Sequence, residues 1–116
     1  MNKTLSILML LVSLLSANSA YAASFRDLME HNCNVTASQL DEVQFMLKTG
    51  VCMGYFSALA DLLRSRGVVC GIDNYSVGAM VELANHELHK HPDLAGEPAH
   101  SAVMAILSAH FMCQSN

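Results

Sequence analysis

The sequence predicts an all-α fold, namely a small four-helix bundle-like domain that two disulfides hold together. Three observations predict this fold: apolar residues recur at helical spacing in several segments, none of these segments alternates as a half-buried strand does, and four cysteines lie within a short chain. The chain contains no internal repeat and is short enough for one domain, so a single hydrophobic core is expected.

Residues 1–22 have the pattern of a secretory signal peptide. A basic start with Lys3 precedes an apolar run over 5–15, and Ala20 and Ala22 place small residues at the −3 and −1 positions of a cleavage site. A membrane anchor is the alternative, but the apolar run is short for one and ends in small and polar residues. We therefore expect cleavage after Ala22 and an exported domain over 23–116 that is not bound to the membrane.

The composition of this mature part argues against nucleic-acid binding and against catalysis. Removing Lys3 leaves five basic side chains against ten acidic ones, a formal charge of −5, and no basic patch remains for nucleic acid. The sequence holds no G-x-S-x-G, H-E-x-x-H or glycine-rich phosphate loop, and a paired cysteine cannot act as a nucleophile. We expect neither enzyme activity nor a cofactor.

Capping residues and sequence breaks predict where the helices begin and end. Helical apolar patterns follow Ser24, Ser38 and Ser76, which predicts an N-cap at each serine. Gly67 is expected to end the second helix, and Pro92 is expected to end the third because the residue before proline is disfavoured in a helix. The expected helices cover about 24–33, 38–65, 76–91 and 98–113, with Pro98 in the first turn of the last.

The segment 51–63 is expected to be the central buried helix, because apolar residues occupy every face of it. Gly50 and Gly54 lie four residues apart and would let another backbone approach closely. Asp61 is the only charge in the segment, so we expect a mostly buried carboxylate that needs a donor; Tyr55 is expected to serve the fold through a buried hydroxyl. One apolar stripe of this helix comprises Val43, Leu47, Gly50, Gly54, Ala58 and Leu62.

The four cysteines are expected to form two disulfides. Cys33, Cys52, Cys70 and Cys113 contain no C-x-x-C, which disfavours a zinc site or a thiol redox pair, and their even number in an exported domain leaves three possible connectivities. The third and fourth helices are joined by a short connection and should be antiparallel, which brings Cys113 back toward Cys70. The pairs Cys70–Cys113 and Cys33–Cys52 are therefore favoured.

One group of histidines has the spacing of a metal site. Glu82, His86 and His89 fall on one face of the third helix at i, i+4 and i+7, where they could offer metal ligands. The same region also carries Asn85 and Lys90, so a solvated helix face is the ordinary explanation. No metal is expected, and a small metal-binding helical protein is kept as an alternative.

Several short motifs occur in a characteristic order along the chain. They are Cys52-Met-Gly-Tyr-Phe, then Asp61, Cys70, His91-Pro92-Asp93-Leu94, Pro98-Ala99 and the ending Phe111-Met112-Cys113. In this order they resemble the resistance-associated (Rap) and type VI amidase immunity (Tai) proteins of Gram-negative bacteria. The chain departs from that family's pattern at Met112, where proline is usual, at Gly71 and at Ala58, but no departure removes a cysteine.

The resemblance implies a small helical periplasmic protein, often a homodimer, that binds a peptidoglycan amidase delivered by type VI secretion. In that family a protruding loop enters the amidase cleft and blocks its Cys-His site, so the inhibitor needs no chemistry of its own. On this chain we expect that role for one loop, because it combines an acid, an amide and an aromatic side chain. Its residues are Gly71, Ile72, Asp73, Asn74 and Tyr75. The turn 93–97 is the second choice.

A function of a different class also fits these features. A small exported helical protein with disulfides could be an acid-stress chaperone that exposes apolar surface as its carboxylates and its six histidines become protonated. Binding of a hydrophobic dye distinguishes the two functions, because a chaperone should expose such surface at about pH 3–5 whereas an inhibitor need not.

Overall fold

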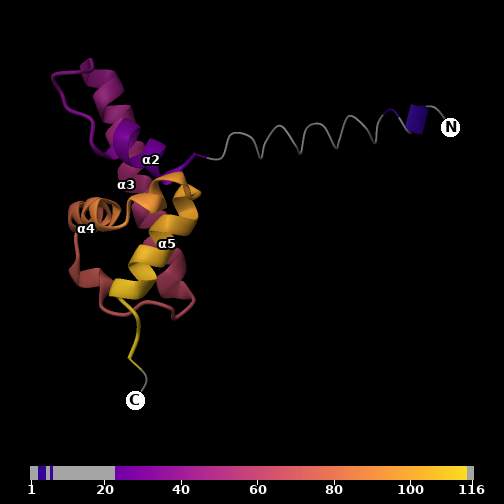
Figure 1. Cartoon of the computed structure of the whole chain (residues 1–116), viewed down its shortest axis with the longest axis vertical. Coiled ribbons are helices and arrows are strands. Elements are labelled where there is room, and N and C mark those ends of the chain that lie inside the picture. Colours follow the sequence, from indigo (N-terminus) through magenta and orange to yellow (C-terminus); the bar gives the residue numbers. More distant parts are fainter. Residues whose placement is uncertain (1–2, 5, 7–22, 115–116) are drawn as a thin grey trace.

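The computed structural model describes residues 3–4, 6 and 23–114, and in this part of the chain it is an all-α domain (Figure 1). The elements of the domain are α2 (Phe25–Leu28), η1 (Met29–Cys33, a π-helical turn), α3 (Glu42–Ser65), η2 (Ile72–Asn74, a 3₁₀ turn), α4 (Val77–Lys90), η3 (Pro92–Gly96, also 3₁₀) and α5 (Ala99–His110). The predicted all-α class is confirmed. Most of the predicted signal peptide lies outside the described residues, and none of the helices that are described is long and apolar enough to cross a membrane.

The first helical segment begins where the sequence predicts. The Ser24 hydroxyl accepts a hydrogen bond from the Asp27 backbone N–H (3.1 Å), and the helical residues continue through η1 to Cys33. The backbone N–H of Phe25 donates to the Glu97 carbonyl (2.8 Å), and the N–H of Ala99 donates to the Ala23 carbonyl (3.0 Å). These bonds place residues 23–25 against the start of α5.

The long helix α3 begins three residues later than predicted, because Asp41 rather than Ser38 is its N-cap. The Asp41 carboxylate accepts from the Gln44 N–H at 2.8 Å, whereas the Ser38 hydroxyl is bonded to Thr36 in a preceding turn. A carboxylate at this position makes a charge-assisted bond and also interacts favourably with the helix dipole, which a serine hydroxyl does not.

The other end of α3 confirms the predicted role of Gly67. This glycine has φ +71°, its N–H donates to the Arg64 carbonyl, and the Val68 N–H donates to the Leu63 carbonyl. This pair of bonds is a Schellman motif, and it requires the left-handed conformation that glycine adopts without strain.

Helix α3 is buried along one stripe only, so the prediction that 51–63 is buried on every face is wrong. Its buried side chains are Cys52, Phe56, Ala60 and Leu63, and they pack with α4, α5 and the first helical segment. The stripe of Val43, Leu47, Gly50, Gly54, Ala58 and Leu62 is exposed. Hydropathy alone could not separate the two sides of α3 because both are apolar. The core forms on the side that carries Cys52, with its disulfide to Cys33, and the Phe56 ring.

The remaining two helices follow the expected pattern. The Ser76 hydroxyl caps α4 by accepting from the Ala79 N–H (3.0 Å), and α4 ends before Pro92 as predicted. One side of α5 faces the core: Ala99, Val103, Ile106 and, just beyond the helix, Phe111 are buried. The sequence predicts Pro98 within the first turn of α5, but in the structure Pro98 is the N-cap and precedes that turn.

Both favoured disulfides are confirmed. Cys33–Cys52 joins the end of η1 to the middle of α3, and Cys70–Cys113 joins the α3–α4 connection to the C-terminal segment. Beside the second bridge, Val69 pairs with Met112 in an antiparallel β-bridge, and the Cys70 N–H donates to the Phe111 carbonyl (2.7 Å). Two such bonds fit a protein that folds in an oxidising compartment.

Removing either disulfide should destabilise the domain by an amount that increases with the length of the loop that the disulfide closes. The bridges span 43 residues (Cys70–Cys113) and 19 residues (Cys33–Cys52). Chain entropy then gives losses of about 4 and about 3 kcal/mol for the respective double Cys→Ala variants. Urea unfolding of both variants measures the two values, and a clearly larger loss for Cys33–Cys52 would contradict this entropic account.

Replacing Gly67 by alanine should lower stability by about 1–2 kcal/mol, because its left-handed backbone is strained for any residue with a Cβ. Gly96→Ala is the matched control, since a Cβ at Gly96 meets open space and its φ is not positive. Thermal unfolding of the two variants tests this difference, and equal melting temperatures would be the contrary result.

Candidate functional site

The candidate site is the connection between α3 and α4, whose first part is tied to the C-terminal end of the chain. Val69 is buried, Cys70 is bonded to Cys113, and the bridge from Val69 to Met112 holds the two segments together. Because Val69 and Cys70 are held in this way, the exposed residues that follow them start from a fixed position.

The segment 71–75 is itself an ordered turn. Gly71 adopts φ +75°, Ile72 is buried in the core, and η2 follows immediately. The N–H of Asn74 donates to the Gly71 carbonyl (3.3 Å), and the N–H of Tyr75 donates to the Ile72 carbonyl (3.0 Å). The buried Ile72 therefore anchors a turn whose other side chains face outward.

Arg64, at the end of α3, connects this turn to the helix. Its guanidinium donates to the Asp73 carboxylate and also to Asp61 (2.9 Å), and the hydrogen bond and charge of Asp73 raise the pKa of Arg64. Asp61 has the donor that was expected, but its side chain is 68% exposed, so the prediction of a mostly buried carboxylate is wrong. Its helix face is solvated because the buried stripe of α3 lies on the opposite side.

Tyr75 supplies the large exposed side chain of the turn. It is 53% exposed, and its ring meets Phe111 edge to face at a centroid distance of 4.6 Å and an interplanar angle of 73°. Phe111 is buried, so it supports one side of the tyrosine while the rest of the ring faces solvent. A large, supported aromatic side chain can contribute strongly to a protein interface.

A cleft of about 370 Å³ lies beside Tyr75. Side chains of α4, the end of α5 and the turn line it: Tyr75, Ala79, Glu82, Leu83, His86, His110 and Phe111. Its walls combine aromatic, aliphatic and polar groups, a mixture that can receive a side chain from a partner. The turn and the cleft together form one surface at the end of the molecule where α5 finishes.

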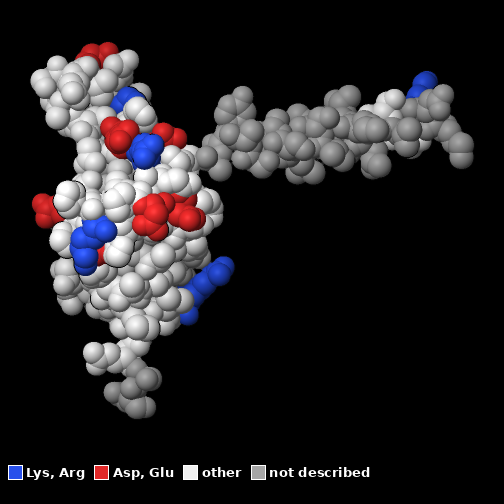
Figure 2. Space-filling model, in the orientation of Figure 1, with Lys and Arg blue, Asp and Glu red and all other residues white. Residues whose placement is uncertain are grey.

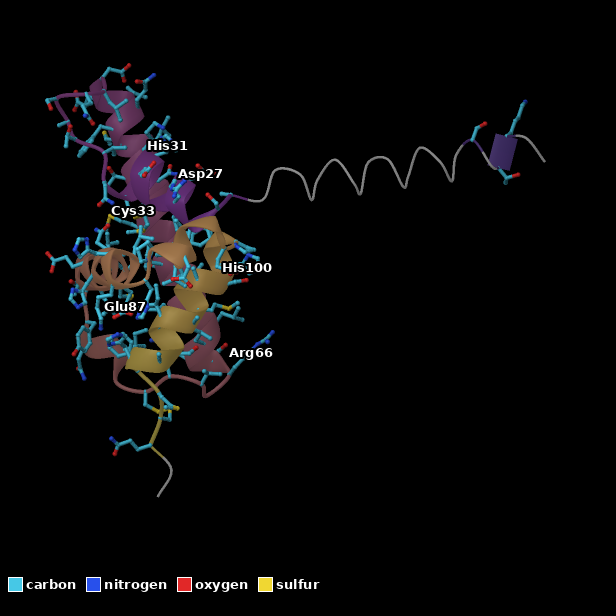
Figure 3. All side chains as sticks on the ribbon, in the orientation of Figure 1. Asp27, His31, Cys33, Arg66, Glu87 and His100 are labelled. Atoms are coloured by element: carbon cyan, nitrogen blue, oxygen red, sulfur yellow. A yellow bond between two sulfur atoms is a disulfide. The ribbon has the colours of Figure 1, made fainter. Side chains whose placement is uncertain are left out.

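Glu87 joins α4 to α5 near this cleft (Figure 3). His110 Nε2 lies 3.3 Å from its carboxylate, and Lys90 and His91 lie 3.9 Å away. The hydrogen bond with His110 is the main reason why the pKa of Glu87 is lowered; partial burial opposes this shift, and the charge of Lys90 adds to it. The side chain is only 15% exposed, so the pair connects the two helices at the edge of the core.

The other predicted residues lie elsewhere or do not form a site. The turn 93–97 overlaps η3 at the start of α5, so a 12-residue helix about 18 Å long separates it from the surface at Tyr75. Glu82, His86 and His89 are exposed on α4, and in the described part of the chain no group of three or more His, Cys, Asp or Glu side chains could hold a metal ion. Tyr55 is half-buried against the core, and burial raises the pKa of its hydroxyl.

Arg64 and Phe111 are the supporting residues that sequence reasoning missed. Arg64 lies three residues after Asp61, which is a recognisable helical ion-pair spacing, but nothing in the sequence indicates its second partner, Asp73. The contact between Phe111 and Tyr75 depends on the disulfide partner of Cys70, so it could be found only after that pairing was known.

Comparison with known families identifies the class of protein. The family of Rap1a immunity proteins matches residues 24–113, nearly the whole domain that the structure describes, and the chain belongs to this family. The expected resemblance is thereby confirmed. An immunity protein acts by binding a toxic effector protein, so membership implies a protein partner. No curated protein and no solved structure gives a significant match to the chain.

The Glu87–His110 pair should make stability depend on pH in a defined direction. Because the folded protein holds the pKa of Glu87 below its ordinary value of 4.5, the contribution of the pair is complete above that pH and is lost as the pH falls below it. Glu87→Gln should therefore lower the melting temperature near neutral pH, and its difference from the wild type should shrink on acidification.

Glu82→Gln is the control for this measurement, because Glu82 is an exposed carboxylate of the same helix without an ion pair among the described residues. Melting temperatures from about pH 7 to about pH 3 test the prediction. A Glu87→Gln deficit that stays constant over this range would show that the carboxylate charge is not responsible.

Proposed function

We propose that this chain is a periplasmic immunity protein that binds a peptidoglycan amidase effector of type VI secretion and blocks its active-site cleft with the turn 71–75. Family membership supports the immunity role, and the resemblance of the sequence motifs to amidase immunity proteins supports the finer assignment. On this proposal residues 1–22 are the signal peptide, and the inhibitor has no catalytic role of its own.

The observation that carries the proposal is the ordered turn itself. Its outward side chains (Asp73, Asn74 and Tyr75) are exposed, while Ile72 and the bridge at Cys70 hold its base. An inhibitor that enters a cleft binds more tightly if its loop is already ordered, because little conformational freedom is lost on binding. This arrangement needs no chemistry from the inhibitor and occludes the cleft by shape.

Charge and assembly complete the proposal. The net negative charge of the chain would favour association with a basic effector surface, mainly by raising the association rate. The family resemblance also implies a homodimer, in which each copy would present its own turn. Family membership favours this function over the acid-stress chaperone and the metal-binding alternatives.

A rescue experiment tests the function directly. Type VI peptidoglycan amidases are exported one at a time to the periplasm of a host bacterium, with and without this full chain. Rescue from one amidase, lost on deletion of residues 2–22, would support the function and identify the partner. Absence of rescue across a broad panel would count against an amidase target.

Replacing Tyr75 by alanine should weaken binding to the amidase from which this chain rescues the host at least about tenfold. A supported aromatic side chain at the centre of an interface is a typical hot spot. The melting temperature should change little, since the ring is half exposed. Glu30→Ala is the control, because Glu30 is an exposed residue of η1, and this variant should bind the amidase as the wild type does. Calorimetric titration measures both, and unchanged affinity of Tyr75→Ala would remove the turn from the interface.

A further inference from the structure

The cleft beside Tyr75 contains one carboxylate that nothing in the described chain neutralises. Glu82 lines this cleft, and its side chain makes no hydrogen bond or ion pair with any described residue. The two histidines of the lining do not compensate it: His110 lies against Glu87 at 3.3 Å, and His86 makes no ion pair among the described residues. With histidines counted as neutral at pH 7, the lining therefore carries a single negative charge.

The cations around this end of the domain are already paired or face elsewhere. Arg64 is bonded to the Asp73 carboxylate, and Lys90 lies 3.9 Å from Glu87. Arg66 projects on the side of α5 that is remote from α4 (Figure 3). Basic side chains form only small, separate groups on the face that Figure 2 shows, and the expected mature part has a formal charge of −5. The uncompensated charge at the cleft is therefore negative and would attract a cation from a partner.

A partner that binds the turn 71–75 also covers this cleft, because Tyr75 belongs to both. Covering the cleft removes the Glu82 carboxylate from water. A buried carboxylate without an opposite charge is strongly unfavourable, and no described residue can supply that charge. A partner surface that fits this end of the domain must therefore bring a cationic group to Glu82.

The other residues of the lining favour a guanidinium over other cations. The Tyr75 ring is half exposed and is held by Phe111 at a centroid distance of 4.6 Å, and the side chains of Leu83 and His86 complete an apolar and aromatic wall. A guanidinium is planar and weakly hydrated, so it can lie against such rings while its N–H groups pair with a carboxylate. The ammonium of lysine is more strongly hydrated. An inorganic cation is disfavoured, because in the part of the chain described no group of three His, Cys, Asp or Glu side chains could hold a metal ion.

The size of the cleft fits one side chain. Its volume of about 370 Å³ lies near the small end of ligand pockets, and it opens at the surface between α4 and the end of α5. A long, flexible side chain from a partner can enter such a space, whereas a whole helix cannot.

We propose that the cleft beside Tyr75 receives an arginine side chain of the effector, whose guanidinium pairs with Glu82 and packs on the Tyr75 ring. The proposal rests on the proposed function, because the effector supplies the arginine. It adds a second task to the surface: the turn 71–75 occludes the active site, and the cleft selects the effector. An effector with a neutral or acidic residue at the matching position leaves Glu82 buried without a partner and is rejected.

The first test needs no effector. The protein is purified from the periplasm after export of the full chain and is titrated, under amide NMR detection, with N-acetyl-arginine amide and with the matching citrulline derivative, which has the same shape without the charge. The arginine probe should shift the signals of Ala79 and Leu83 in the cleft. It should bind at least about threefold more tightly than the citrulline probe, which is the gain expected from a partly exposed ion pair.

Two variants assign this difference to the carboxylate. Glu82→Gln should make the arginine and citrulline probes equivalent, and it should keep the wild-type melting temperature because the Glu82 carboxylate has no partner to lose. Glu30→Gln is the matched control, because Glu30 is an exposed carboxylate on η1, outside the cleft. This variant should retain the preference for arginine.

The second test uses the amidase that the rescue experiment identifies. Glu82→Gln should weaken its binding at least about tenfold, since the partner's guanidinium would then be buried without a counter-charge. The affinity of this variant should also depend less on salt concentration than that of the wild type. Glu82→Arg should abolish binding, and replacing the matching arginine of the amidase by glutamate should restore it. A role of Glu82 in the fold alone would produce neither the change in salt dependence nor this restoration.

Three results would overturn the proposal. These are equal binding of the two probes to the wild type, no shift of the cleft signals with either probe, or unchanged amidase affinity in Glu82→Gln. The last result, combined with loss of binding in Tyr75→Ala, would leave the proposed function standing and remove the cleft from the interface. Failure to rescue any amidase would reject the proposed function, while the probe titration would still decide whether the cleft binds a guanidinium.

Discussion

The candidate site depends on the tie between the α3–α4 connection and the C-terminal segment. The disulfide Cys70–Cys113 and the bridge Val69–Met112 bring two segments together that lie 43 residues apart in the chain. They also place Phe111 beneath Tyr75. Without this tie the ten or so residues after α3 would be an ordinary helix connection, and ordering them would oppose any binding event. The bridge therefore orders the candidate site as well as crosslinking the domain.

The two apolar sides of α3 differ in what covers them within the described chain. Phe56 and the Cys52 half-cystine lie on the buried side, where α4, α5 and η1 cover them. Gly50 and Gly54 lie on the opposite side, where the described chain supplies no cover. A domain this small has too few elements to enclose a 24-residue helix completely, so part of its apolar surface stays available to another molecule.

The ion pairs of this protein position side chains more than they stabilise the fold. Arg64 is half exposed and shared between Asp61 and Asp73, and exposed pairs of this kind contribute little to stability because water and salt screen them. Their effect is to restrain the orientation of the Asp73 carboxylate at the edge of the turn. Glu87 is better shielded, and its contact with His110 joins α4 to α5 beside the cleft.

The sequence by itself determined the all-α class, the ends of α4 and the glycine C-cap of α3, because each rests on local spacing, and the order of its motifs indicated the immunity family. It favoured the observed disulfide pairs without excluding the other two connectivities. It did not determine which side of α3 is buried, since both sides are apolar, nor the choice between Ser38 and Asp41 as N-cap, since both residues are good caps. Only the tertiary structure decided that Asp61 is solvated and that Arg64 and Phe111 support the turn. Those outcomes depend on which elements meet across long separations in the chain, and local patterns carry no record of such contacts.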